Sequence, residues 1–422
     1  MLLEASDRLG GKIHSERIGN ATLEWGPDSF LVAKPRGAGL ARELGLGDDL
    51  ISPGPLGRSA YLYLKGRLRR MPPGMAMGVP TGIKPLFVAV RDGIINPFGA
   101  ARAAIEPLLP RRGGEDPTAA EVARYRLGKQ VANRLVAPLV AGVFGVPYDE
   151  VSLRSALPML ASSRSWVLTM AKRPAPSGAP IFHSISGGMN RFVDGIVAEL
   201  PKKAVRTGVA VTSLQRKADK WVLTTSEGKH IDADAVLIAT PTHATAPMLA
   251  EVAPETSAAL EPIRYHASAV ALLRYGVDDL GRELDASGFL VAPEEGRTVA
   301  ASSWLNAKWP QQDYGAIWIR AIVTDEELLA TPDDALRSRI AAEINEVLEA
   351  RRSPEEVRMV RWPDALPVYS PGHAKRIEAA LSALPEGIAL AGAAYRGFGI
   401  PDCISTGEEA ADRLLAGFVT PS

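Results

Sequence analysis

Apolar residues along the chain follow both the strand and the helix period, which predicts an α/β protein. Residues 235–241 form an apolar run that ends in a turn, and residues 388–391 form another ahead of a glycine-rich stretch. Such runs are typical of central parallel strands, which are buried on both faces. Residues 209–214 and 221–225 alternate between apolar and polar positions instead, and indicate an antiparallel pair.

Helical periodicity dominates residues 85–158. Thr118 and Glu121, three residues apart, predict a capping box at one helix start. The following run places Arg124, Arg126, Lys129 and Arg134 on one basic face. A solvated surface, and a surface that meets membrane headgroups or a carboxylate-rich substrate, both remain open for this face.

The second half of the chain mixes strands with one clear helix. Residues 61–68 predict a hairpin, and residues 267–273 and 315–323 predict strands. A helix is predicted to start at Thr331-Pro332, because a threonine cap and a proline in the first turn favour that position. Its apolar stripe consists of Leu336, Ile340, Ile344 and Val347.

Composition narrows the classes of function. Among the 422 residues, 48 basic ones balance 48 acidic ones, so no overall field attracts nucleic acid. The single cysteine, Cys403, excludes an intramolecular disulfide and suits a reducing cytoplasm. Six scattered histidines predict no metal site, and no apolar run reaches the ~20 residues of a spanning helix. We expect a cytoplasmic protein, with peripheral contact at the inner face of the cell membrane as an alternative.

The first thirty residues carry the most specific chemistry. Leu2 and Leu3 indicate a parallel strand that ends on Glu4, with Arg8 and the pair Gly10-Gly11 close behind. In a dinucleotide fold, a carboxylate at the end of the second strand accepts hydrogen bonds from ribose, about 20 residues after a glycine-rich phosphate turn. Because that turn does not precede Glu4, the sequence predicts a Rossmann-like unit whose first strand, turn and helix are missing.

Three motifs resemble one family. Residues 4–12 read E-A-S-D-R-L-G-G-K and resemble the flavin-binding start of the superfamily of monoamine oxidase and phytoene desaturase. Residues 24–30 read E-W-G-P-D-S-F, with Lys34 four residues on, and resemble more narrowly the protoporphyrinogen and coproporphyrinogen oxidases of Gram-positive bacteria. Residues 391–411 are similar to the closing motif of that family.

The resemblance implies FAD as cofactor, bound by both ends of the chain and a middle segment. A helix starting near residues 403–405 would point its amide end at the isoalloxazine, with Cys403 as a packing residue rather than a nucleophile. The implied cofactor-binding residues are Glu4, Ala5, Arg8, Gly11, Lys12, Gly26, Pro27, Asp28, Ser29, Val211, Trp362, Gly392, Ala393, Phe398, Gly399 and Ile400.

The resemblance also implies a division into three parts. Residues 1–50, 184–250 and 385–422 would form a Rossmann-like FAD domain that is incomplete at its start. Residues 51–74 and 251–384 would form an α+β substrate domain. Residues 75–170 would form a helical lobe, for which membrane contact is one alternative. Residues 141–147 depart from the family pattern.

The implied activity is oxidation of a porphyrinogen by dioxygen in heme biosynthesis, with coproporphyrinogen III favoured over protoporphyrinogen IX. The former carries four carboxylates and the latter two, so basic residues would decide the choice, with Lys34 and Arg396 as candidates. A ferrochelatase-type enzyme would act next and is a candidate partner. The alternatives are an amine or polyene oxidase of the same superfamily and a non-enzymatic remnant without flavin.

Overall fold

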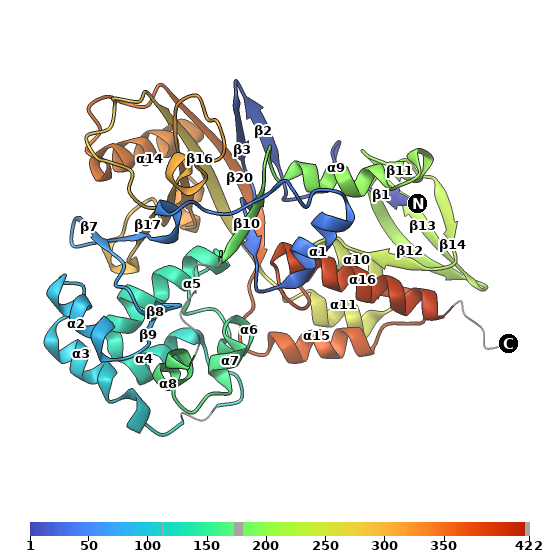
Figure 1. Ribbon diagram of the computed structural model, residues 1–422. Helices are drawn as coiled ribbons and strands as arrows, with labels where there is room; N and C mark the ends of the chain where they lie inside the picture. The colour runs from blue at the N-terminus through green and yellow to red at the C-terminus, as the bar shows by residue number, and fades with distance from the viewer. Residues whose placement is uncertain (112–113, 173–179, 418–422) are drawn as a thin grey trace.

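The computed structural model describes residues 1–111, 114–172 and 180–417, which form a mixed α/β fold (Figure 1). Its largest sheet has seven strands in the order β20-β16-β19-β18-β17-β6-β7, in which β17 and β6 run parallel. The strands are β6 (Tyr61–Leu64), β7 (Arg67–Arg70), β16 (Tyr265–Tyr275), β17 (Gly288–Val291), β18 (Ala301–Trp304), β19 (Ile317–Val323) and β20 (Glu356–Pro367). The predicted hairpin and both predicted strands are therefore confirmed.

Helix α14 (Asp333–Val347) packs its apolar stripe against this sheet, as predicted. Its residues Leu336, Ile340 and Ile344 are fully buried in one cluster with sheet residues. The prediction of a Thr331 cap is wrong, because the helix is preceded by Pro332 and the Thr331 hydroxyl donates to Leu328 O instead, at 2.7 Å.

Parallel strands near the chain ends form two short ladders. β1 (Leu2–Leu3) pairs with β11 (Val205–Arg206), and β15 (Val236–Ile238) pairs with β21 (Ile388–Leu390). Within the described residues these ladders are separate sheets. Leu237 in β15 is 39 % exposed, so the prediction of a strand buried on both faces is wrong at this residue.

The ladders lie among helices and hairpins on the right of Figure 1. Here α16 (Ile400–Ala416) packs beside α1 (Pro35–Glu43), and α11 (Pro254–Leu260) packs beside α15 (His373–Ser382). Outside the group of helices described in the next paragraph, the structure also contains α9 (Asn190–Ala198), α10 (Thr242–Leu249), α12 (Leu305–Lys308) and α13 (Glu326–Leu329). The remaining strands are β2 (Ser15–Ile18), β3 (Ala21–Glu24), β4 (Phe30–Leu31), β5 (Leu50–Ile51), β8 (Met75–Ala76), β9 (Val79–Pro80), β10 (Phe182–Ile185), β12 (Val211–Lys217), β13 (Lys220–Thr225) and β14 (His230–Ala233).

A group of helices at the lower left of Figure 1 has a core of its own. It comprises α2 (Ile83–Arg91), α3 (Pro97–Ala104), α4 (Ala119–Val131), α5 (Ala137–Phe144), α6 (Leu153–Ala156), α7 (Pro158–Ala161) and α8 (Trp166–Ala171). The predicted capping box is present, since Thr118 Oγ1 accepts from Glu121 N and Glu121 Oε2 accepts from Thr118 N, both at 3.2 Å.

The predicted basic face of α4 is wrong at Arg126. Arg126 is buried, and its Nη1 donates to Glu106 Oε1 at 2.7 Å. Arg124 pairs with Asp149, and Arg134 pairs with Glu294, each at 2.6 Å. Lys129 is exposed and has no ion pair among the described residues, so Arg126 is the one predicted cation that is withdrawn from the surface. Among the described residues, none of the helices is long and apolar enough to cross a membrane.

Candidate functional site

The end of β1 brings two predicted cofactor residues together. The amide of Glu4 donates to Arg206 O at 2.9 Å, and Val209 N donates to Glu4 O at 2.9 Å. Glu4 therefore lies beside the segment that leads to Val211, the first residue of β12. Its Oε1 accepts from the amide and hydroxyl of Ser6, both at 2.8 Å, and no donor among the described residues reaches Oε2. One carboxylate oxygen is thus free to accept from a ribose hydroxyl.

The predicted residues Arg8 and Gly11 meet in a tight turn. Arg8 donates from Nη1 to Ile13 O at 3.1 Å and from Nη2 to Gly11 O. Gly11 has a φ of +56°, which suits glycine. The guanidinium of Arg8 thus fixes the backbone of the turn, and a direct contact of Arg8 with a cofactor stays a prediction. Ala5, between Glu4 and this turn, is exposed.

Lys12 and Gly26 are in backbone contact. A Cβ on Gly26 would lie 1.7 Å from Lys12 O, so no other residue fits at this position without moving the chain. The Lys12 ammonium lies 5.2 Å from the ring centroid of Tyr265. Burial lowers the pKa of Lys12, and Asp364 opposes that shift. Among the described residues no carboxylate is within ion-pair distance of Lys12, which leaves a partly buried cation without an anion.

Residues 26–29 are held by two cations, one from α12 and one from β19. Lys308 Nζ donates to Asp28 Oδ2 at 2.6 Å, and Arg320 Nη2 donates to Gly26 O at 2.6 Å. Burial alone would raise the pKa of Asp28, but Lys308 and Arg320 outweigh it and hold that pKa well below its usual range. Asp28 also accepts from Ser29 Oγ at 2.9 Å. Asp28 therefore anchors the loop, and Pro27 lies half-buried within it.

Trp362 adds a third link to the same loop. Its Nε1 donates to Trp25 O at 2.9 Å, which joins β20 to the residue before Gly26. Trp362 is half-buried and belongs to the cluster of Trp25, Trp309 and Trp318. This places the predicted aromatic residue beside the predicted flavin loop, while its contact with flavin stays a prediction.

The closing motif is organised by a residue that the sequence did not single out. The hydroxyl of Tyr369 donates to Ala393 O at 2.5 Å and accepts from Gly397 N at 2.9 Å. The Phe398 ring packs edge-on against Tyr369, with centroids 5.7 Å apart. Tyr369 is buried, so its two hydrogen bonds fix the backbone on both sides of Arg396.

His373 supports Tyr369 from the first turn of α15. Its ring stacks on the Tyr369 ring at 4.2 Å between centroids, and its Nε2 lies 2.8 Å from Ala394 O. Burial lowers the pKa of His373 to about 4, so the ring is neutral near pH 7 and donates from Nε2. The sequence does not predict Tyr369 and His373 as site residues, because the prolines near them indicate only a loop between two elements.

Helix α16 begins at Ile400 and not at residues 403–405 as predicted. Its N-cap is Gly399, whose amide donates to Asp402 Oδ2 at 3.2 Å. Gly392, with a φ of +113°, donates its amide to Thr406 Oγ1 at 3.1 Å, which ties β21 to this helix. Burial raises the pKa of Cys403 to about 11, with Asp402 adding to the shift. Cys403 therefore carries a thiol at neutral pH, as expected of a packing residue.

Both predicted substrate-binding cations are paired with acids of α16. Lys34 Nζ lies 2.5 Å and 2.6 Å from the two Asp402 oxygens, and its side chain is 45 % exposed. Arg396 Nη1 lies 2.6 Å from Glu409 Oε2, and both side chains are more than half exposed. The Arg396–Glu409 pair is exposed and contributes little stability, so Arg396 can exchange its partner for a ligand carboxylate. Asp402 is only 16 % exposed and holds Lys34 with both oxygens, so the Lys34 pair is the firmer of the two.

These residues fit FAD at its two ends. Glu4 offers an open oxygen for the ribose, Lys12 offers an uncompensated cation, and Gly392 to Ile400 form a backbone-lined segment at a helix start. Two pockets lie away from these residues. One is in the helical lobe, and the other is lined mainly by residues of β12, β13 and the loop before β21.

Comparison with known proteins identifies the family. Residues 1–415 match the flavin containing amine oxidoreductase family. Coproporphyrinogen III oxidase of Bacillus subtilis (strain 168) is 32 % identical over 98 % of this chain and 91 % of its own. Protoporphyrinogen oxidase of Homo sapiens is 28 % identical over 98 % and 92 % of the two chains.

A solved structure gives the same result for the fold. A protein of Exiguobacterium sp. 255-15, provisionally described as a protoporphyrinogen oxidase, superimposes with a TM-score of 0.86 at 26 % identity, covering 98 % of this chain and 92 % of that one. The family match and the fold together define a flavin-dependent oxidoreductase. The chain belongs to the flavin containing amine oxidoreductase family, which implies FAD as its cofactor.

Proposed function

We propose that this flavoenzyme oxidises coproporphyrinogen III to coproporphyrin III with dioxygen as acceptor. The observation that carries the proposal is the match to the Bacillus subtilis coproporphyrinogen III oxidase along 98 % of the chain. Bound FAD supplies the two-electron oxidation chemistry, and three rounds with dioxygen convert a porphyrinogen into a porphyrin. The product would be the substrate of a metal-inserting, ferrochelatase-type enzyme.

The protein's own contribution is to position the ligands and exclude water. The loop at residues 26–29 is fixed by Lys308, Arg320 and Trp362, and the closing motif is fixed by Tyr369. These two rigid segments are proposed to lie on either side of the ring system where oxidation occurs. Such a site needs no general acid–base pair.

The choice of substrate is proposed to depend on Lys34 and Arg396. In the free protein each cation has a carboxylate partner on α16, and in the complex a propionate would take the place of that partner. Coproporphyrinogen III has two propionates more than protoporphyrinogen IX, so it gains more from accessible cations. Protoporphyrinogen IX is the second candidate substrate, favoured by the relative from Homo sapiens.

The test is an assay of the purified, FAD-loaded protein with both porphyrinogens, monitored by porphyrin fluorescence. We expect a higher kcat/KM for coproporphyrinogen III. A higher value for protoporphyrinogen IX would assign the second substrate, and turnover of an amine or polyene alone would overturn the proposal. A folded protein that binds no flavin would instead indicate the non-enzymatic remnant.

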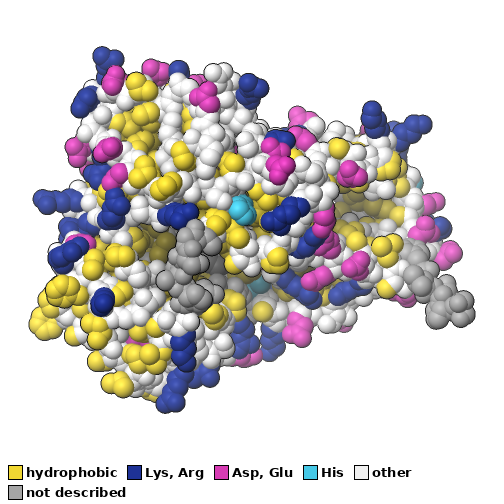
Figure 2. Space-filling model, in the orientation of Figure 1, with side chains coloured by type: hydrophobic (Ala, Val, Ile, Leu, Met, Phe, Trp, Pro, Cys, Tyr) yellow, Lys and Arg dark blue, Asp and Glu magenta, His cyan; other side chains and the backbone are white. Residues whose placement is uncertain are grey.

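We also propose peripheral membrane contact through α2 and α3. Ile83, Phe87 and Phe98 are 76 %, 72 % and 86 % exposed, and Figure 2 shows apolar side chains gathered at the lower left, where these helices lie. The charged residues within the two helices are Lys84, Arg91 and Arg102. Arg91 pairs with Asp92 at 2.8 Å and Arg102 donates to Arg126 O at 2.9 Å, so Lys84 is the exposed cation that has no partner among the described residues. Exposed aromatic and aliphatic side chains beside cations suit an anionic lipid surface.

Sedimentation with vesicles tests this contact. The protein should pellet with phosphatidylglycerol vesicles more than with phosphatidylcholine vesicles, and Phe87→Ser with Phe98→Ser should abolish the difference. Equal sedimentation of the wild type and the double variant would contradict the contact.

A further inference from the structure

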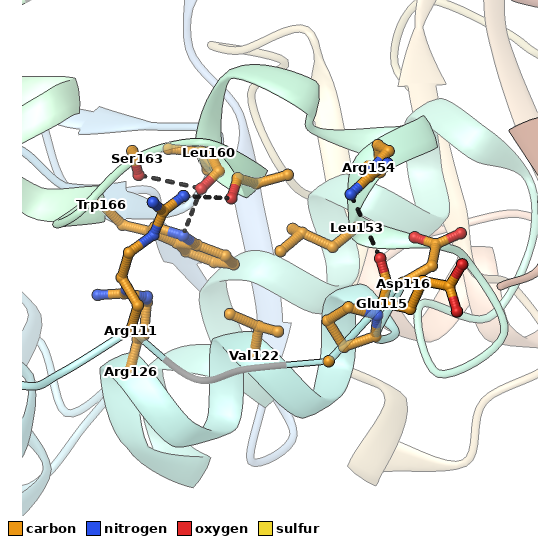
Figure 3. Close-up of a pocket in the computed structure, with 13 residues that line it drawn as sticks. Arg111, Glu115, Asp116, Val122, Arg126, Leu153, Arg154, Leu160, Ser163 and Trp166 are labelled. Atoms are coloured by element: carbon orange, nitrogen blue, oxygen red, sulfur yellow. Dashed lines mark hydrogen bonds between the residues drawn. The ribbon is translucent and has the colours of Figure 1, made fainter. Parts of the chain in front are cut away.

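The helical lobe contains a small pocket lined by three arginines. It lies between α4, α6, α7 and α8, and its volume is about 70 Å³. Figure 3 shows Arg111 and Arg126 on one side of this pocket and Arg154 on the other. None of the predicted flavin or substrate residues lines it, so the pocket is independent of the function proposed above.

Arg126 is the buried member of the three. It is 3 % exposed, and its Nη1 donates to Glu106 Oε1 at 2.7 Å and to Arg164 O at 2.8 Å. Glu106 is fully buried and also accepts from the amides of Trp166 and Val167, at 2.9 Å and 3.2 Å. Within the described part of the chain, Nε and Nη2 of Arg126 have no hydrogen-bond acceptor. A rigidly held guanidinium thus keeps donors available at the pocket.

The other two arginines lack a neutralising partner. Arg111 Nη2 donates to Ser162 O at 2.8 Å, and Arg154 Nη2 donates to Glu115 O at 3.3 Å, so both are oriented by backbone carbonyls. Neither has an ion pair with a carboxylate among residues 1–111, 114–172 and 180–417. The pocket therefore holds two arginines without an ion pair among the described residues, in addition to Arg126.

Two acids also line the pocket wall. Asp116 accepts from Ser152 Oγ at 2.5 Å and from Gly372 N at 2.7 Å. Glu115 is 84 % exposed and lies 3.3 Å from Lys375. Both carboxylates keep negative charge at the pocket, so a bound oxyanion is favoured by the guanidinium donors that lack a carboxylate acceptor among the described residues.

The volume sets the size of that anion. A cavity needs about 10–15 Å³ to hold one water molecule. A cavity of about 70 Å³ therefore has room for about five heavy atoms. Inorganic phosphate has five heavy atoms and a carboxylate group has three. A nucleotide or a porphyrin does not fit.

We propose that this pocket binds one small oxyanion, a phosphate or a carboxylate, between Arg111, Arg126 and Arg154. Arginine is suited to this role because its planar fork donates two parallel hydrogen bonds to an oxyanion.

Titration calorimetry of the full chain tests the proposal with inorganic phosphate and, separately, with acetate, each against sodium chloride at the same ionic strength. We expect saturable binding with one site and a rise in Tm as the ion is added. The double variant Arg111→Gln, Arg154→Gln should lose at least about a hundredfold in affinity, since it removes two charge-assisted hydrogen bonds to the ion. Both side chains are exposed, so the variant is expected to fold.

Arg339→Gln is the matched control, because Arg339 is an exposed arginine on α14 without an ion pair among the described residues. It removes a charge without touching the pocket and should bind as the wild type does. Binding of phosphate alone, acetate alone or both identifies the class of oxyanion. Absence of saturable binding for both ions, or equal affinity in the double variant and in Arg339→Gln, would overturn the proposal.

Discussion

Removing the Tyr369 hydroxyl tests whether the closing motif depends on its two hydrogen bonds. In Tyr369→Phe the ring can keep its stacking on His373, while Ala393 O and Gly397 N lose their partner in a partly buried position. An unpaired buried polar group costs about 1–3 kcal/mol, and both groups are only partly buried, so each should cost about 1–2 kcal/mol and together lower the free energy of unfolding by about 2–4 kcal/mol. The segment between Gly392 and Ile400 should then be less well positioned for flavin.

Urea unfolding and FAD titration measure the two effects separately. We expect FAD to bind at least about tenfold more weakly, which corresponds to ~1.4 kcal/mol. Tyr275→Phe is the matched control, because Tyr275 is also buried. Its hydroxyl donates to Asn345 Oδ1 at 2.8 Å, between β16 and α14. That variant should lose stability without losing FAD affinity. Wild-type FAD affinity in Tyr369→Phe would refute the role assigned to the hydroxyl.

Three further predictions concern the loop, the substrate and pH. Gly26→Ala should fail to retain FAD in gel filtration, because its Cβ would lie 1.7 Å from Lys12 O, whereas Gly407→Ala on α16 meets nothing within 4 Å and should retain it. Lys34→Gln should lower kcat/KM for coproporphyrinogen III more than for protoporphyrinogen IX in steady-state assays, and an equal change would remove Lys34 from substrate choice. Burial raises the pKa of Glu24 to about 7 against the hydrogen bonds from Met189 and Ser15. Since the folded pKa lies above the unfolded value of 4.5, stability from the protonated Glu24 should be lost as the pH rises from 4.5 through 7, and urea unfolding of Glu24→Gln should show a flatter pH profile.

Local patterns of the sequence predicted the elements that are stabilised locally. The capping box at Thr118, the hairpin at residues 61–70 and the stripe of α14 follow from spacing alone, because each depends on neighbours in the sequence. The proximity of Glu4 to the segment before Val211 was also predictable, through the family motif.

Long-range pairing could not be predicted in the same way. Arg126 lies on a helix whose sequence suggests a solvated face, and only the buried Glu106, 20 residues away, makes its burial favourable. The contacts of Lys308 and Arg320 with residues 26–28 join positions about 280 to 294 residues apart. Tyr369 was missed for the same reason, since its partners are defined by the tertiary fold.

Anaerobic mixing of the FAD-loaded protein with coproporphyrinogen III tests the central claim most directly. The account predicts that the visible absorbance of the oxidised flavin is bleached at a rate that rises with substrate concentration. Admission of dioxygen should then restore the absorbance while porphyrin fluorescence accumulates. Flavin that stays oxidised in the presence of both coproporphyrinogen III and protoporphyrinogen IX would contradict the assignment.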